Sequence, residues 1–195
     1  MLKFVIDEFV TQHEINCLAT DLGWIFADKI QPSDTNPLEI IWTTDDRQNF
    51  IHYVEDDWLG SRYFAFQGVS TDNLALSLYN NSRIKLYSLQ DVLTFVERAE
   101  DPKEQSKIAA MLGILAPDKF DAISFNAFSQ LLSSSSPGVR QMAILAAAYR
   151  GWPEFKRLLQ HIKESDPEDF VRWRAEVALQ AYDYVHPDSL QNKKI

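Results

Sequence analysis

The chain has 195 residues, 46% of them apolar and only 6 of them glycine, and its formal net charge is −9. This length fits one large domain or two small ones, and the composition excludes an intrinsically disordered chain. The 19 basic against 28 acidic residues argue against nonspecific nucleic-acid binding, which needs clustered lysine and arginine. The excess of acid is most simply a solubility feature, and it also fits a partner protein with a basic face.

Targeting signals and disulfides are not expected either. No apolar run approaches the roughly 18 residues of a membrane-spanning helix, and residues 1–8 lack the features of a signal peptide. The single cysteine, Cys17, excludes an intramolecular disulfide, so we expect a protein of a reducing compartment, the cytoplasm, with no membrane contact. Cys17 lies in an apolar helical pattern, which predicts a buried structural thiol.

The region before residue 100 mixes helix and strand signals. Thr11 and Glu14 form a capping box, which predicts a helix that stops at Gly23. Three runs rich in β-formers then follow one another with short links, which predicts an antiparallel meander; they cover residues 38–43, 49–54 and 63–66. Apolar residues on both faces of the second run indicate a sheet covered on both sides, and flanking helices could provide the cover.

Two interpretations are open for residues 70–86. Apolar residues at helical spacing favour a helix that begins near residue 70 and precedes a short strand at 84–86. The alternation of Leu74, Leu76 and Leu78 fits a strand instead. We favour the helix because Asn80-Asn81 suits a helix C-terminus. A further helix is predicted from Ser88, with apolar residues at i, i+3, i+4 and i+7.

From Asp101 onward the sequence repeats one pattern. Three alanine-rich segments each follow a breaker, and the equivalent alanines Ala109, Ala143 and Ala175 lie 34 and 32 residues apart. A period of that size, with two helices per unit, is typical of a stacked-helix array. The expected helices are 103–115, 121–132, 138–150, 153–164 and 167–184, and the last of them starts a third unit without completing it.

These repeats resemble HEAT-type repeats, of the short form found in phycobilin-lyase-like and related bacterial proteins. Residues 136–143 and 166–175 carry the resemblance: a proline after a polar residue, then Val-Arg, then alanines on the packed face. It extends over residues 101–184. In such families the arginine often pairs with an aspartate of a neighbouring unit, so the resemblance implies a structural role for Arg140 and Arg172.

The predicted fold is therefore an α+β N-terminal domain, an antiparallel meander with flanking helices, followed by a short α-solenoid of HEAT-like helical hairpins. The expected division is an α+β domain at 1–100, helical repeats at 101–186 and a polar tail at 187–195.

No residues are assigned to catalysis, to a cofactor or to a metal. The four histidines lack the spacing of a ligand set or a triad, and no phosphate loop, nucleophile elbow or Cys-x-x-Cys is present. An acid–base or metal site at His52 is conceivable, but a strand followed by an acidic turn is the simpler interpretation. Asp45-Asp46 and residues 55–57 could gather carboxylates at one end of the sheet and bind a cation weakly.

The best candidate for binding is the turn at residues 149–155, which mixes tyrosine, arginine and tryptophan, as interface hot spots do. For Trp152 we favour the alternative that it closes the core of its own repeat with Phe155. Second helices of such arrays usually line the concave face. The candidate partner-binding residues are Tyr149, Arg150, Trp152, Lys156, Gln160, Lys163 and Arg174.

The predicted function is a non-enzymatic adaptor or scaffold that binds another protein, with no nucleic-acid or membrane partner. Two alternatives stay open. The family resemblance suggests a lyase-like or chaperone component that handles a tetrapyrrole. The acidic charge and small size fit an immunity or regulatory protein that inhibits a toxin or an enzyme.

Overall fold

The computed structural model describes residues 1–80 and 83–185. The chain divides into two compact units, one from Met1 to Asp91 and one from Val92 onward. The division expected at residue 100 falls inside the second unit, and the tail expected at 187–195 lies outside the described residues.

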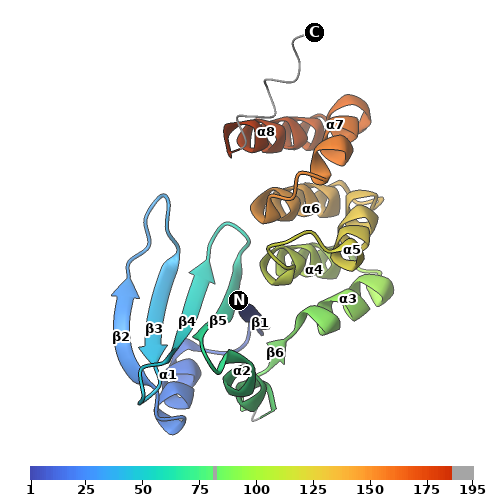
Figure 1. Ribbon diagram of the computed structural model, residues 1–195. Helices are drawn as coiled ribbons and strands as arrows, with labels where there is room; N and C mark the ends of the chain where they lie inside the picture. The colour runs from blue at the N-terminus through green and yellow to red at the C-terminus, as the bar shows by residue number, and fades with distance from the viewer. Residues whose placement is uncertain (81–82, 186–195) are drawn as a thin grey trace. The chain divides into compact units, whose positions relative to one another are not determined.

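The first unit is built on a six-stranded sheet in the order β2-β3-β4-β5-β1-β6 (Figure 1). The strands are β1 (Leu2–Ile6), β2 (Ile25–Ile30), β3 (Leu38–Thr43), β4 (Asn49–Asp56), β5 (Ser61–Gly68) and β6 (Leu86–Tyr87). Every neighbouring pair is antiparallel. The expected meander is confirmed as β3, β4 and β5, and the sheet also contains β1 and β2, which the sequence patterns did not reveal.

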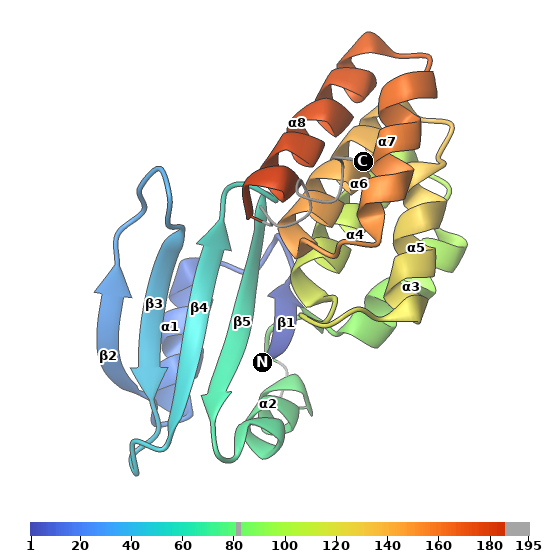
Figure 2. The ribbon, with the colours of Figure 1, turned by 45° about the horizontal axis from the view of Figure 1, so that its top comes forward.

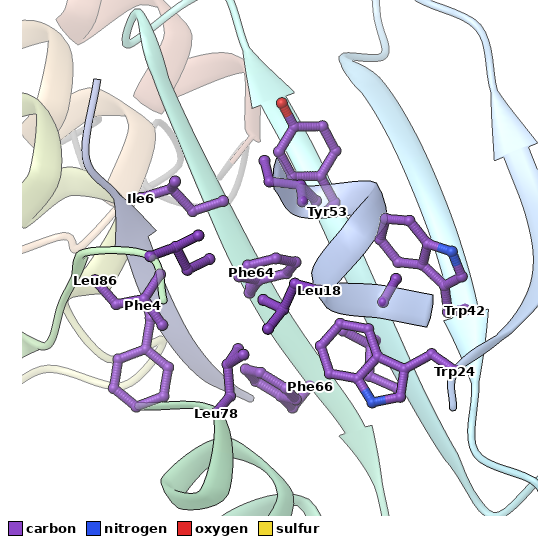
Figure 3. Packing of buried hydrophobic residues seen from close by; sticks show 14 of the residues in the cluster. Phe4, Ile6, Leu18, Trp24, Trp42, Tyr53, Phe64, Phe66, Leu78 and Leu86 are labelled. Atoms are coloured by element: carbon purple, nitrogen blue, oxygen red, sulfur yellow. The ribbon is translucent and has the colours of Figure 1, made fainter. Parts of the chain in front are cut away.

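Helices α1 (Gln12–Asp21) and α2 (Thr71–Asn80) pack on one face of this sheet. Figure 3 shows Leu18 of α1 and Leu78 of α2 against the aromatic rings of the sheet. The centre of this core is fully buried Phe64 and Tyr53, whose ring centroids lie 6.0 Å apart. Because both helices lie on the same face, they do not supply the expected cover on the opposite face.

The helix interpretation of residues 70–80 is confirmed. Ala75 and Leu78 are buried while Leu76 is 52% exposed, which is the pattern of one helix face rather than of strand alternation. The short strand that follows is β6 at residues 86–87 instead of 84–86.

The expected burial of Cys17 is wrong, because its thiol is exposed. Residues Ile15, Leu18 and Ala19 form the buried side of α1. Cys17 precedes Leu18 by one position, which turns it about 100° away from that side. Its Sγ atom lies 3.6 Å from Nε2 of His13 on the helix surface.

Replacing Thr11 with alanine should destabilise the first unit by about 1 kcal/mol. The Thr11 hydroxyl accepts a hydrogen bond from the Glu14 amide at 3.2 Å, and the Glu14 carboxylate accepts one from the Thr11 amide at 2.7 Å. Urea unfolding measures the effect, with Thr11→Ser as a control that keeps the acceptor. Equal midpoints for wild type and Thr11→Ala would show that the capping box does not stabilise α1.

The second unit is helical. Its helices are α4 (Pro102–Leu115), α5 (Ala122–Leu132), α6 (Pro137–Arg150), α7 (Phe155–Ser165) and α8 (Asp169–Val185), and α3 (Leu89–Arg98) spans the division between the units. These bounds confirm the five helices expected from the repeat. Helices α4, α6 and α8 stack as one layer, and α5 and α7 lie in a second layer beside them (Figures 1 and 2).

The breakers and alanines explain this stack. Asp101 caps α4 through a 3.0 Å bond from the Glu104 amide, with Pro102 in the first turn, as the breaker pattern predicts. Gly151 ends α6 in the left-handed conformation, with φ of 72°. The three equivalent alanines are fully buried on α4, α6 and α8, where their small side chains allow the helices to approach closely.

Candidate functional site

Trp152 lies in the core, where a partner cannot reach it. Its side chain is 2% exposed, and its ring stacks on Phe155 at 5.5 Å with an interplanar angle of 10°. Phe120 and Phe128 pack against its other sides, and its indole nitrogen donates to the Asp118 carbonyl at 3.2 Å. Trp152 therefore closes the aromatic core between α5 and α7.

Arg150 is also held inside its own repeats. Its guanidinium donates to the Ala116 carbonyl at 2.7 Å and to the Asp118 carboxylate at 2.8 Å. Only 11% of the side chain is exposed. Arg150 thus ties the end of α6 to the loop between α4 and α5, and its first role is structural.

Lys156, Gln160 and Lys163 follow one side of α7 at i, i+4 and i+7, and we call these three residues the α7 surface. Phe155 and Leu159, about 100° around the helix from Lys156 and Gln160, are fully buried. Gln160 donates to Glu164 at 2.5 Å, and Lys163 forms a half-exposed ion pair with Glu176 of α8 at 3.1 Å. Tyr149, 38% exposed at the end of α6, precedes this helix in the chain.

Arg174 lies on a different side of α8 from the residue that meets the α7 surface. Glu176 contacts Lys163, and a separation of two residues turns a side chain about 200° around a helix. Arg174 instead places its guanidinium over the Trp173 ring, 5.2 Å from the centroid. Arg174 is therefore separate from the α7 surface, although the sequence grouped them.

The arginine implied by the family resemblance forms a buried, bidentate ion pair in the second unit. Arg140 on α6 donates through Nε and Nη2 to both oxygens of Asp166, at 2.7 and 2.8 Å. Its third nitrogen donates to the carbonyls of Ser134 and Ser135. Asp166 precedes α8, so this pair joins one repeat to the next, as the resemblance implied.

The pKa of Asp166 reflects this pair. Burial alone would raise the pKa of the Asp166 carboxyl, but hydrogen bonds from Arg140 and from the Glu168 amide, with the Arg140 charge, outweigh it. The net effect is a lowered pKa, so the carboxylate stays ionised at neutral pH.

The prediction that the two acidic segments gather at one end of the sheet is wrong, because they lie at opposite ends of β4. Asp45 and Asp46 lie in the turn before β4, while Glu55 and Asp56 lie at the end of that eight-residue strand. Such a strand separates them by about 25 Å. Among residues 1–80 and 83–185, no group of three or more His, Cys, Asp or Glu could hold a metal ion.

Sequence reasoning missed the real partner of His52. Its Nδ1 lies 2.5 Å from the Glu39 carboxylate on β3, across the register that pairs Ile41 with His52. The two residues are 13 positions apart, so only the strand register reveals the contact. The other ring nitrogen is buried without a hydrogen-bond partner among the described residues.

Residues 89–180 match the family described as HEAT repeats. This part of the chain is a HEAT-repeat segment. The match begins at residue 89 rather than 101, so the HEAT-repeat segment includes α3 as well as the five helices of the stack. The searches of curated proteins and of solved structures found no match to this chain. Within the described residues, no helix is long and apolar enough to cross a membrane.

Proposed function

We propose that this protein is a non-enzymatic adaptor that binds another protein through its HEAT-repeat segment. The observation that carries the proposal is α7, whose apolar side is buried against α5 and α8 while Lys156, Gln160 and Lys163 line another side. A second-layer helix with one packed side and an adjacent polar side can contribute to the extended face through which repeat arrays bind partners. The single cysteine favours a cytoplasmic location.

The charge of α7 suggests which chemistry the partner presents there. Lys156, Arg157 and Lys163 are basic and Glu164 is acidic, so this helix is locally positive within a chain of net charge −9. A partner that docks on α7 should therefore offer carboxylates to it. The expectation of a basic partner face, which rests on the net charge, stays a prediction for the rest of the surface.

Affinity capture from a lysate of the native host tests this proposal. The surface variant combines Tyr149→Ala, Lys156→Glu and Gln160→Ala and spares Arg150 and Trp152, which hold the fold. Lys103→Glu is the matched control, because Lys103 is the second residue of α4 as Lys156 is of α7.

We expect a stoichiometric protein that wild type and Lys103→Glu capture and the surface variant loses. A partner that all three chains retain equally would contradict the assignment to α7. A toxin or enzyme as partner would select the inhibitor alternative. A copurifying pigment without a protein partner would select the tetrapyrrole alternative and overturn the adaptor proposal.

A further inference from the structure

Helix α8 exposes an apolar stripe made of Phe170, Trp173 and Val177. These side chains are 43%, 55% and 37% exposed. They follow one another at i, i+3 and i+7, which places them along one side of the helix. The other side packs into the array through Val171, Ala175, Ala178 and Tyr182.

The repeat register identifies the residues of α6 that are equivalent to the stripe. Ala143 of α6 is equivalent to Ala175 of α8, so Gln141 and Leu145 are equivalent to Trp173 and Val177. Gln141 and Leu145 each lie two residues from Ala143, hence on the opposite side of α6, and both are half-buried. The printed contacts of α6 with the following repeat run through Arg140, which pairs with Asp166, and through the Ala147 carbonyl, which accepts from Tyr182. On α8 the positions equivalent to Gln141 and Leu145 are Trp173 and Val177, which are 55% and 37% exposed.

The charges beside the stripe are arranged for a parallel helix. With Phe170 at heptad position a and Trp173 at d, Asp169 takes position g and Arg174 takes position e. In a parallel pair, a g residue of one helix faces the e residue five positions later on the other. Asp169 therefore meets an arginine at position 174 when the facing helix is a second α8, and it does so twice by symmetry.

An antiparallel pair lacks this complementarity, because it places g beside g and e beside e. Asp169 and Glu176 would then face acids, and Arg174 would face itself. Asp169 can reach a second copy because its side chain is 93% exposed, and it also pairs with Arg172 of its own helix. The Nε atom of Arg174 is buried, so the terminal nitrogens of its guanidinium would donate across the contact.

We propose that two copies of this chain associate through parallel α8 helices about a twofold axis. The two stripes pack against each other, and Asp169 of each copy pairs with Arg174 of the other. This surface is distinct from α7, so self-association leaves the proposed adaptor face open. A 17-residue helix is about 25 Å long, and one helix per copy makes a small interface, so association should be weak and concentration-dependent.

Sedimentation equilibrium of the full chain tests the proposal with a charge exchange. We expect the mean mass of wild type to rise with concentration from 22.5 kDa towards twice that value. Asp169→Arg alone and Arg174→Asp alone should each stay monomeric, because each places like charges opposite one another. An equimolar mixture of the two variants should recover association, since each variant supplies the charge that the other needs.

Recovery in the mixture separates pairing from damage to the fold, which would not be repaired by mixing. Should Asp169→Arg fail to fold, Trp173→Gln removes the stripe and leaves both charges, and it should also abolish association. A wild type that stays monomeric at about 500 μM overturns the proposal, because association with a dissociation constant below that value would be visible there. Undiminished association in both single variants overturns it as well. So does a monomer in which Trp173 is shielded from an aqueous quencher, because residues of the same chain would then cover the stripe.

Discussion

Replacing Arg140 with alanine should lower the free energy of unfolding of the HEAT-repeat segment by about 3–5 kcal/mol. The change removes both hydrogen bonds to Asp166 and leaves that carboxylate buried, with 4% of its side chain exposed and no opposite charge in bidentate contact. It also leaves the carbonyls of Ser134 and Ser135 without their donor. Guanidinium unfolding followed by far-ultraviolet circular dichroism measures the loss.

Lys163→Ala is the control, because its ion pair with Glu176 joins α7 to α8 in a half-exposed position. Exposed pairs contribute about 0–1 kcal/mol, so this variant should remain close to wild type. Similar losses of unfolding free energy in both variants would mean that burial does not determine how much the Arg140–Asp166 pair stabilises the fold.

The contribution of the Arg140–Asp166 pair to the free energy of unfolding should also depend on pH. The folded-state pKa of Asp166 is lowered, so the stabilisation is fully present above the unfolded-state pKa of about 3.9 and is lost as pH falls through the folded value. The stability difference between wild type and Asp166→Asn should therefore be constant from pH 5 to 7 and shrink below pH 4. A difference that shrinks between pH 7 and 5 would point to a different titrating group.

Replacing Trp152 with alanine should destabilise the same segment by about 3–5 kcal/mol. The indole ring contacts Phe120, Phe128 and Phe155, and its removal leaves a cavity between α5 and α7. The loss of the donor to the Asp118 carbonyl adds a smaller contribution. Thermal and denaturant unfolding of the variant measure the total.

Trp152→Phe keeps one aromatic ring in this core but removes the pyrrole ring with its N–H donor, so it leaves a smaller cavity than the alanine variant. It should cost about 1–2 kcal/mol, well below the alanine variant. If Trp152→Ala were as stable as wild type, Trp152 would not stabilise the core and would again be a candidate for the binding surface.

The helical half of the fold was largely predictable because its signals are local. A proline, a capping aspartate or both mark the starts of α4, α5 and α6, and the buried alanines Ala109, Ala143 and Ala175 recur at intervals of 34 and 32 residues, so they locate the stack without tertiary information. The same register places the unfinished third unit at α8. These features need only the residues within one or two helical turns.

The parts that escaped prediction depend on distant contacts. Strand β1 is a short apolar run, and it becomes a strand by pairing with β5, some 60 positions later in the chain. Strand β2 is exposed at every position, so it shows neither alternation nor an apolar run. A turn with tyrosine, arginine and tryptophan indicated a surface, yet Trp152 and Arg150 contact groups near residue 118 in the preceding hairpin.

The central claim is that the HEAT-repeat segment binds a protein through the α7 surface. The most direct test is a calorimetric titration of the captured partner, purified, into wild type, Lys103→Glu and the surface variant. We expect equal affinity for the first two chains and a loss of at least about tenfold for the surface variant, since hot-spot truncations cost more than 1 kcal/mol each. Equal affinity for all three chains, each melting cooperatively, would contradict the claim and place the binding face outside α7.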